Sequence, residues 1–280
     1  MTKFLVWKIS PNIPPIPLEV SEKWRTLDDV SESLPGGAYT TFRTYEGFKV
    51  LNFTDHTTRL ERTAQLSGQP VILNIDKLRA DLHEIIHAVP FTEKRLRVTL
   101  DLENDPGTVY IAVEELVTPP LSAYQQGVKV ITRRLERSNP QAKVTTFIST
   151  AAMIRSEIPL DVNEVIMVDG MDHLLEGLSS NFFVVFRRQL WTAGEGVLLG
   201  GTRKVVLEIT KLLEIPIRLE AQHLTDVTNF EEAFITSVSR SVLPVTQIND
   251  HVLGDGKVGS ITRQIMLAFE NRVKHEAELI

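Results

Sequence analysis

One carboxylate beside an apolar stretch limits how the surrounding chain can fold. The segment Leu174–Phe186 reads LLEGLSSNFFVVF, with Glu176 close to an apolar run that predicts a buried strand. A carboxylate drawn into a protein interior normally has a cationic partner or becomes protonated, because an unpaired buried charge is costly. No cationic side chain in the neighbouring sequence accounts for Glu176, so a fold that buries this residue must supply a cation from elsewhere.

Length and composition indicate an ordinary globular protein. The chain has 280 residues, 42% of them hydrophobic, which is enough for one large domain or two lobes. Its 36 acidic and 30 basic residues are intermixed without a basic stripe, so a nucleic-acid partner is not expected. The absence of cysteine excludes disulfides, thiolate catalysis and cysteine-bound metals.

Membrane and export signals are not evident in the sequence. No apolar run approaches the roughly 20 residues that span a bilayer. The apolar patch near the N-terminus is broken by Lys8 and prolines and is too short for a signal peptide. We therefore expect a cytoplasmic protein that does not bind a membrane.

Strand and helix patterns alternate over the first 117 residues. The predicted strands are Ala38–Tyr45, its hairpin partner Phe48–Phe53, Leu96–Leu100 and Val109–Val113. Asp55 is the expected cap of a helix that ends at Ser67-Gly68, and Asn74 begins a second helix with one apolar face. These elements indicate a small N-terminal α/β lobe, residues 1–117.

A proline-containing stretch, residues 118–126, is the expected linker to a larger lobe, residues 127–280. Both strand and helix patterns occur in this lobe. The predicted strands are Val128–Thr132, Glu164–Val168, Phe182–Phe186, Ile217–Glu220 and Ala233–Ile235. The predicted helices are Thr202–Leu213 and Ser260 to about Ala277.

Three segments hold residues whose chemistry suits a ligand, and each has a structural alternative. Gly200-Gly201-Thr202-Arg203 is either a phosphate cup of backbone N–H groups or a glycine turn with a threonine N-cap. Arg59 either clamps a phosphate with its planar fork or pairs with an acid such as Asp55. Lys143 is either a surface lysine or a Schiff-base lysine in a semi-buried place. These residues alone do not decide between the alternatives.

No metal site is predicted. His83 and His87 stand at helical spacing without a third ligand, which argues against zinc. The sequence also has no Gly-x-Ser-x-Gly elbow and no Walker phosphate loop.

Seven segments, taken in order, resemble a known enzyme family. They are GAYTTFRT, HTTRL, AKVTTFI, EGLSSNFFVV, LLGGTRKVVLEI, EAFITSVSRSVLPV and LGDGKVGSITRQI. Together they are similar to the fold type IV (class IV) family of pyridoxal 5′-phosphate enzymes, which includes branched-chain and D-amino-acid aminotransferases and 4-amino-4-deoxychorismate lyase. The resemblance extends from about Leu34 to the C-terminal helix, and EGxSSNxF followed by LxGxTR is its most specific part. It implies a two-domain α+β fold with a small N-terminal α/β lobe and a larger, β-barrel-like C-terminal lobe with helices.

The resemblance also implies roles for the chemistry-bearing residues. Lys143 would form the Schiff base with pyridoxal 5′-phosphate, and Glu176 would be the partner of the protonated pyridine nitrogen. The cofactor would then be the cation that Glu176 requires. Arg59 and the Gly201-Thr202 pair would hold the phosphate, the latter through backbone N–H groups and the threonine hydroxyl.

The chain departs from the family pattern at two places near the site. Many members have a tyrosine a few residues after the lysine, touching the cofactor's phenolic oxygen, whereas this chain reads Val144-Thr145-Thr146-Phe147-Ile148 and offers no tyrosine there. A loop often written with a Gly-Thr pair reads Thr236-Ser237-Val238-Ser239-Arg240 here, so one hydroxyl contact to the phosphate is expected to be missing. The backbone N–H groups of Val238 and Ser239 remain available for a phosphate or a substrate carboxylate. Tyr39 and Arg240 are the predicted substrate-binding residues, and a structural salt bridge is the alternative role of Arg240.

The function that the resemblance implies is transamination between a small amino acid, or an amine, and a 2-keto acid. The chief alternative is a lyase of the aminodeoxychorismate type, which would use Lys143 to release pyruvate by β-elimination. A protein that only binds a ligand is a third possibility, but it would need neither the lysine nor the pyridinium partner. The family forms homodimers, so a homodimer is expected as well.

Overall fold

In the computed structural model, which describes residues 4–11 and 13–280, the chain forms two units, each with its own core. The first unit comprises Met1–Val117 and two later segments, Ala142–Ala152 and Val273–Ile280. The second comprises Thr118–Gln141 and Met153–Arg272. Residues 1–3 and 12, which belong to the predicted N-terminal lobe 1–117, lie outside the described residues.

The first unit is built on an antiparallel sheet. Its strands are β1 (Phe4–Ile9), β2 (Ile16–Pro17), β3 (Gly37–Arg43), β5 (Lys94–Asp101) and β6 (Val109–Glu115). They lie in the order β2-β1-β6-β5-β3, and every neighbouring pair is antiparallel. The sequence predictions of strands at β3, β5 and β6 are confirmed, with ends that differ by a few residues.

The predicted hairpin partner Phe48–Phe53 is wrong. The extended backbone there is limited to β4 (Lys49–Val50), which pairs with β16 (Glu278–Leu279), whereas β3 pairs with β5. The reason is that helix α2 begins at Phe53, after Asn52 has adopted a left-handed conformation with φ of 54°. Asn52 is thus the residue at the helix N-cap, and Asp55, the predicted cap, lies in the first turn.

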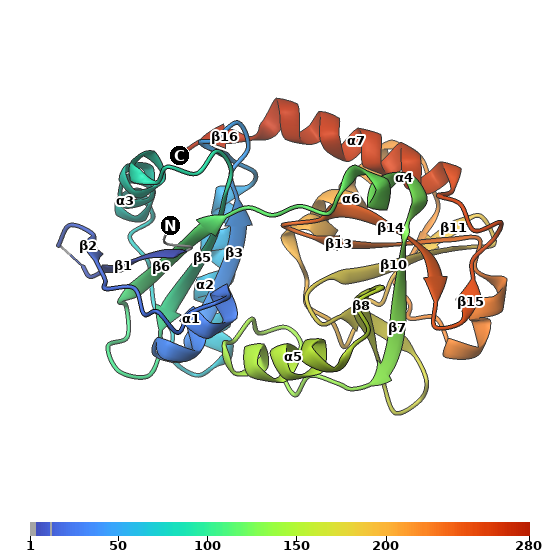
Figure 1. Ribbon diagram of the computed structural model, residues 1–280, viewed down its shortest axis with the longest axis horizontal. Coiled ribbons are helices and arrows are strands. Elements are labelled where there is room, and N and C mark those ends of the chain that lie inside the picture. Colours follow the sequence, from blue (N-terminus) through green and yellow to red (C-terminus); the bar gives the residue numbers. More distant parts are fainter. Residues whose placement is uncertain (1–3, 12) are drawn as a thin grey trace. The chain divides into compact units, whose positions relative to one another are not determined.

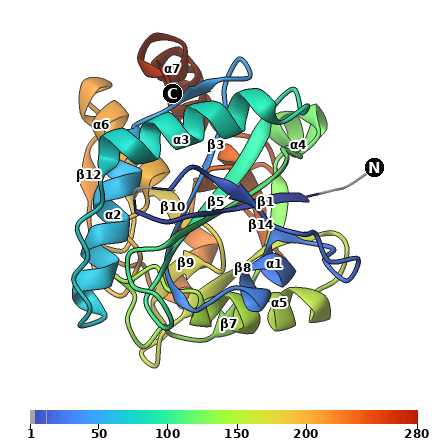
Figure 2. The ribbon, with the colours of Figure 1, turned by 90° about the vertical axis from the view of Figure 1, so that its left-hand side faces the viewer.

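Helices cover both faces of this sheet (Figure 2). They are α1 (Leu27–Ser33), α2 (Phe53–Leu66) and α3 (Ile75–Ala88). The predicted start of α3 is confirmed, because the Asn74 side chain accepts a hydrogen bond from the Lys77 N–H. Helices α2 and α3 bury apolar residues such as Leu60 and Leu82 against one face, and α1 buries Val30 against the other.

The second unit contains a closed six-stranded barrel (Figure 1). Its strands are β7 (Val128–Arg134), β8 (Val162–Val168), β9 (Leu174–Gly177), β10 (Asn181–Phe186), β13 (Glu232–Ser237) and β14 (Ser241–Ile248). The order is β9-β10-β13-β14-β7-β8, and the β8–β9 pairing closes the ring. Short strands extend it: β11 (Gln189–Trp191), β12 (Ile217–Arg218) and β15 (His251–Val252). The barrel-like lobe implied by the resemblance is confirmed.

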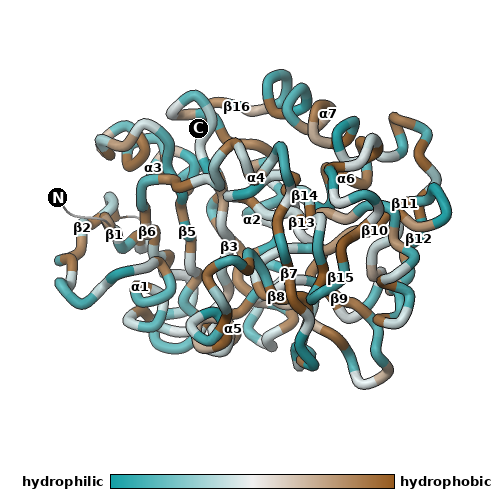
Figure 3. The backbone as a smooth tube through the Cα atoms, turned by 45° about the vertical axis from the view of Figure 1, so that its right-hand side comes forward, coloured by the Kyte–Doolittle hydropathy of each residue, from teal (hydrophilic) through white to brown (hydrophobic). Residues whose placement is uncertain are grey.

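Apolar side chains from the barrel strands form the core of this unit. Figure 3 shows the hydrophobic colour along β8 and β10. Fully or almost fully buried core residues include Val130, Ile166, Phe182, Val184, Ile235 and Leu243. Phe183, on the opposite face of β10, stacks on Phe234 with ring centroids 4.8 Å apart. Both faces of β10 are therefore buried, which explains its unbroken apolar run.

Helices account for most of the remaining chain. They are α4 (Leu121–Gln126), α5 (Thr146–Glu157), α6 (Gly201–Leu212), the 3-10 helix η1 (Leu224–Asn229) and α7 (Ser260–Glu276). The predictions of α6 and α7 are confirmed to within one residue at each end. Helix α6 buries Val205, Val206 and Ile209, the apolar face expected from their spacing.

Candidate active site

In the first unit, one face of α2 holds the backbone of Lys143 in place. Arg59 and Thr63 lie one turn apart on α2. Thr63 Oγ1 accepts a hydrogen bond of 3.3 Å from the Lys143 N–H. The Lys143 carbonyl in turn accepts a bond of 2.9 Å from the N–H of Tyr39 on β3. The backbone of Lys143 is thus fixed on both sides, by a helix and by a strand, and the residue is half-buried.

The Lys143 side chain extends over an aromatic ring. Its Nζ lies 4.8 Å from the centroid of the Tyr39 ring, within the range of a cation–π contact. The guanidinium carbon of Arg97 lies 5.2 Å from the same centroid. Arg97 is buried and donates hydrogen bonds of 2.9 Å to the Leu27 carbonyl and to Asp28. Tyr39 therefore contacts two cations, one of them the predicted catalytic lysine.

Strand β3 is hydrogen-bonded at its first residue, Gly37, to the chain beyond Lys143. The Gly37 N–H donates to Thr145 Oγ1 at 3.0 Å, and the Thr145 N–H donates to the Gly37 carbonyl at 3.0 Å. A Cβ at Gly37 would lie 2.0 Å from the Leu100 carbonyl oxygen on β5, so no larger residue fits without moving the backbone. The glycine thereby lets β3 approach β5 closely, while its backbone groups bind the segment that carries Lys143.

His56 lies on α2 beside these residues, and sequence reasoning did not single it out. The side chain is buried, and its Nδ1 is hydrogen-bonded at 2.9 Å to Thr40 Oγ1 on β3. Burial lowers the pKa of His56 well below its usual value, and the charges of Arg59 and Lys143 lower it further. His56 is therefore neutral at physiological pH, between two cationic side chains.

Arg59, the predicted phosphate residue, is held in a partly desolvated place. Burial lowers its pKa, and the charge of Asp55 opposes this effect. A guanidinium retains its charge even when its pKa falls moderately, so Arg59 stays cationic. The structural alternative of pairing with Asp55 and the phosphate role are compatible, since one acid does not occupy the whole guanidinium fork.

In the second unit, Glu176 is buried and has a cation supplied by the protein. It is 2% exposed, and its Oε1 lies 3.4 Å from Nε of Arg137, a side chain that is itself 8% exposed. Asn181 Nδ2 donates a hydrogen bond of 2.9 Å to Glu176 Oε2. Burial lowers the pKa of Arg203, and the Glu176 charge opposes the shift, so a second arginine senses the same carboxylate.

Sequence reasoning missed both partners of Glu176 for different reasons. Asn181 belongs to the SSN motif, and the β9–β10 pairing places it directly opposite Glu176. Predicting a β-hairpin at this motif would therefore have identified Asn181 as a partner. Arg137 lies just after β7, and only the closed barrel brings it to Glu176. The protein itself therefore supplies a cation for this carboxylate, and the expected pairing of Glu176 with the cofactor ring stays a prediction.

The loop before α6 presents backbone N–H groups without a side-chain cap. The helix begins at Gly201 with Gly200 as N-cap, and no side chain caps it, so the alternative in which Thr202 is the N-cap is wrong. Gly200 packs tightly on Asn181, because a Cβ there would lie 2.3 Å from Asn181 Oδ1. Asn181 Nδ2 also donates to the Leu198 carbonyl at 2.7 Å. An open helix N-terminus of this kind favours an anion.

Arg240 forms the salt bridge that was the alternative to a carboxylate clamp. Its Nη2 lies 2.8 Å from Oε2 of the buried Glu164 and 2.6 Å from Ser179 Oγ. Its Nε donates to Ser237 Oγ at 3.1 Å. Burial tends to raise the pKa of Glu164, but the charge and hydrogen bond of Arg240 outweigh it, and the pKa lies below its usual value. The guanidinium thus ties the Val238–Ser239 turn to the Ser179 turn.

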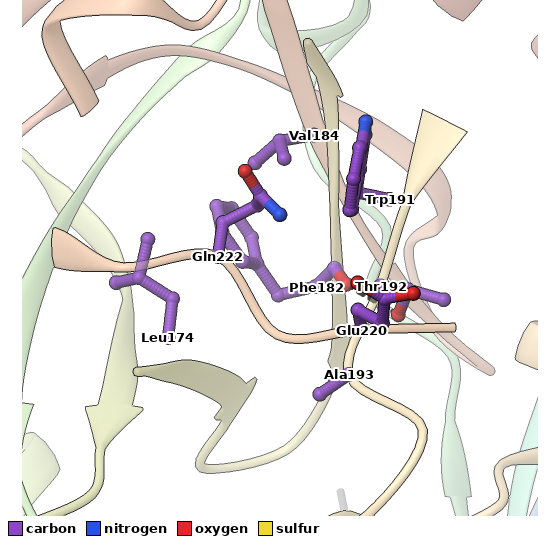
Figure 4. A pocket seen from close by; sticks show the side chains of 8 residues that line it. All are labelled: Leu174, Phe182, Val184, Trp191, Thr192, Ala193, Glu220 and Gln222. Carbon is purple, nitrogen blue, oxygen red and sulfur yellow. Dashed lines mark hydrogen bonds between the residues drawn. The ribbon is translucent and has the colours of Figure 1, made fainter. Parts of the chain in front are cut away.

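A small cavity in the second unit does not contain the predicted site residues (Figure 4). It is lined by Leu174, Phe182, Val184, Trp191, Thr192, Ala193, Glu220 and Gln222. Its volume of about 10 Å³ is at the lower limit for one water molecule, so it is too small for a cofactor.

Residues 4–11 and 13–280 contain neither a cluster of metal-binding side chains nor a helix that could span a membrane. No group of three or more histidine, aspartate or glutamate side chains in that part of the chain could hold a metal ion. No helix formed by those residues is long and apolar enough to cross a membrane.

Comparisons with known proteins identify a family to which the chain is similar. Residues 37–248 match the model of a family described as amino-transferase class IV. A probable branched-chain-amino-acid aminotransferase of Thermotoga maritima is 30% identical over 265 residues, covering 89% of this chain and 93% of that protein. A D-alanine aminotransferase of Bacillus licheniformis is 24% identical over 274 residues, covering 92% and 95% of the two chains.

Solved structures show the same fold. The crystal structure of a branched-chain amino acid aminotransferase candidate from Thermotoga maritima superposes with a TM-score of 0.81 at 28% identity, over 98% of this chain and 97% of that chain. A branched-chain amino acid aminotransferase from Escherichia coli superposes with a TM-score of 0.78 at 21% identity, over 98% and 96%.

Proposed function

The chain belongs to the class IV aminotransferase family, and we propose that it moves an amino group between a small amino acid, or an amine, and a 2-keto acid with pyridoxal 5′-phosphate as cofactor. The observation that carries this proposal is the anchoring of Lys143 between α2 and β3 within the matched region. Aminotransferase names on relatives from both the branched-chain and the D-alanine groups favour transamination over the lyase alternative.

The residues present fit the cofactor chemically. The buried carboxylate of Glu176 suits a protonated ring nitrogen, and the uncapped N-terminus of α6, at Gly201 and Thr202, suits a phosphate. Arg59 offers a guanidinium fork that suits a phosphate, and Lys143 offers an amine that suits an aldehyde. When bound, pyridoxal phosphate supplies an aldehyde that condenses with amines and a ring that takes up the electron pair left when a substrate's α-proton departs.

Lys143 acts as the proton carrier in this scheme. With a substrate amine on the cofactor, Lys143 Nζ would be a free amine that takes the proton from the substrate's α-carbon and returns it to the cofactor's C4′ carbon. The backbone bonds to Thr63 and Tyr39 fix the point from which the side chain extends, and its Nζ lies 4.8 Å from the centroid of the Tyr39 ring. Neutral His56 adds no positive charge to a region that already contains Arg59 and Lys143.

Glu176 holds the charge that the reaction needs. The Arg137 cation at 3.4 Å favours the ionised carboxylate, and the Asn181 amide fixes its orientation. An ionised Glu176 in turn keeps a ring nitrogen protonated. The backbone N–H groups of Val238 and Ser239, in a turn fixed by Arg240, are proposed as further phosphate or carboxylate donors.

Borohydride reduction followed by peptide mapping tests the proposal directly. The expected result is a pyridoxyl adduct on Lys143, and its loss in Lys143→Ala. Lys129→Ala is the matched control, because Lys129 is a lysine of the second unit paired with Asp161 at 3.3 Å and has no proposed role. A reduced protein without an adduct on Lys143 would refute the enzyme reading.

The substrate and the reaction type require separate assays. A half-reaction screen follows the cofactor's visible absorbance while L-amino acids, D-amino acids and (R)- and (S)-amines are offered in turn. Amino transfer that depends on a keto acid supports the proposal, whereas pyruvate release from aminodeoxychorismate without an acceptor supports the lyase. A cytoplasmic location and a homodimer also belong to the proposal, and light scattering on the purified protein measures the latter.

A further inference from the structure

Three polar side chains lie side by side across three barrel strands. Asn181 on β10 is directly opposite Glu176 on β9 and directly opposite Thr236 on β13. Residues opposite each other in antiparallel strands share one face of the sheet. The hydrogen bond between Asn181 and Glu176 confirms this for the first pair. The row therefore presents a carboxylate, an amide and a hydroxyl on the same face.

The hydroxyl of Thr236 differs from those of other buried threonines in this unit. Thr236 is 1% exposed, and its Oγ1 has no hydrogen-bond partner among the described residues. By contrast, Thr192 Oγ1 donates to the Phe182 carbonyl at 2.8 Å, and Thr210 Oγ1 donates to the Val206 carbonyl at 2.7 Å. Because a buried hydroxyl without a partner destabilises a fold, a partner outside the polypeptide is indicated.

The surroundings of Thr236 indicate which partner fits. Its neighbour Asn181 contacts the loop before α6, through the bond to the Leu198 carbonyl and the close approach to Gly200. Helix α6 packs against β13, the strand that carries Thr236. The uncapped N-terminus of α6 and the hydroxyl of Thr236 therefore flank the same asparagine. A helix N-terminus and a hydroxyl donor both recognise oxyanions.

We propose that Thr236 is a further cofactor-binding residue, whose hydroxyl donates a hydrogen bond to a phosphate oxygen of the cofactor at the N-terminus of α6. This inference rests on the proposed function. It assigns Asn181 a positioning role, since its amide holds Glu176 on one side and the α6 loop on the other. It also explains why a hydroxyl is retained among buried apolar residues such as Phe234 and Ile235.

The test compares the full-length apoprotein and its variants by two measurements, melting temperature and affinity for free pyridoxal 5′-phosphate. Thr236→Val keeps the side-chain shape but removes the hydroxyl, and Thr236→Ser keeps the hydroxyl. We expect Thr236→Val to weaken cofactor affinity about tenfold, the usual effect of one hydrogen bond to a charged group, with an unchanged or higher apoprotein melting temperature. Thr236→Ser should restore affinity to within about twofold.

Thr192→Val is the matched control, because its buried hydroxyl already has a backbone partner. It should lower the apoprotein melting temperature and leave cofactor affinity unchanged. Titration with pyridoxal, which lacks the phosphate, tests whether the Thr236 hydroxyl binds the phosphate group. Thr236→Val should leave the affinity for pyridoxal unchanged. Equal weakening for pyridoxal would overturn the phosphate assignment.

Two other outcomes have separate meanings. If Thr236→Val lowers the apoprotein melting temperature as Thr192→Val does and leaves cofactor affinity unchanged, the hydroxyl serves the fold and the proposal is overturned. If the wild-type apoprotein binds no pyridoxal 5′-phosphate and yields no adduct on Lys143, the proposed function itself fails.

Discussion

Removing Arg137 should destabilise the second unit strongly, because its charge faces a carboxylate that the barrel buries. The Arg137 Nε and Glu176 Oε1 atoms are 3.4 Å apart, and the two side chains are 8% and 3% exposed. At an effective dielectric constant of about 20, two unit charges at this distance attract by about 5 kcal/mol. Truncating one partner of a buried pair usually costs about 3–5 kcal/mol, so we expect Arg137→Met to lose that much of the free energy of unfolding.

The assay should report on the second unit alone. Of the three tryptophans, Trp191 belongs to the second unit and the other two, Trp7 and Trp24, to the first. In a Trp7→Phe/Trp24→Phe background, the fluorescence of Trp191 therefore follows urea unfolding of the second unit. With a typical dependence of about 1–3 kcal/mol per molar urea, the midpoint for Arg137→Met should fall by at least about 1 M.

Arg133 provides the control, because its ion pair with Glu157 is shorter than the Arg137–Glu176 pair but more exposed to solvent. Its Nη1 lies 2.7 Å from Glu157 Oε2, and the two side chains are 46% and 50% exposed. Arg133→Met should cost less than about 1 kcal/mol, since exposed ion pairs contribute little. The double variant Arg137→Met/Glu176→Gln should recover part of the loss. Equal midpoints for Arg137→Met and Arg133→Met would show that burial of the pair does not determine its contribution.

Three further predictions concern charge and pH. Glu176→Gln should keep cofactor binding but slow turnover by about two orders of magnitude, equivalent to about 3 kcal/mol, and wild-type turnover would exclude the electron-sink role. The pKa of His56 in the folded protein lies below its usual value of about 6.5, so the unfolded chain binds the extra proton first as the pH falls. The free energy of unfolding should therefore decrease below about pH 6.5, by up to about 1.4 kcal/mol per pH unit. In His56→Phe, the urea midpoint should change less between pH 6.5 and pH 5 than it does in the wild type. An equal change of the midpoint with pH in both proteins would assign the effect to other groups. Arg240→Met should lower the unfolding free energy by about 3–5 kcal/mol by removing the partner of buried Glu164, whereas a raised KM with unchanged stability would identify a substrate clamp.

Much of the fold follows from local patterns. The Asn74 cap, the apolar face of α6 and the unbroken apolar run of β10 all depend on neighbours close in sequence, and each is confirmed. The errors occur where distant segments compete. Residues 48–53 contain extended signals, but the early start of α2 and the arrival of β16 leave β4 only two residues and a partner from the end of the chain.

The residues of the candidate site likewise fall into two groups, those identified from sequence motifs and those identified only from the structure. Motif order alone was enough to single out Lys143, Glu176, Arg59 and Thr202, because each stands in a short segment with its own pattern. The roles of Arg240 and Thr236 required coordinates. Arg240 meets Glu164 only across the barrel, and the lack of a partner for Thr236 can be recognised only when every neighbouring donor and acceptor is in place.

Glu176 illustrates the separate contributions of local sequence and tertiary structure. The sequence by itself determined that this carboxylate would be drawn inward and would need a cation, since burial of an unpaired charge is costly wherever it occurs. Only the closed barrel decided that Arg137 supplies one, because charge pairing acts over a few ångströms in space and is indifferent to distance along the chain. The cation lies in the segment before Lys143, a residue that the motifs had already marked.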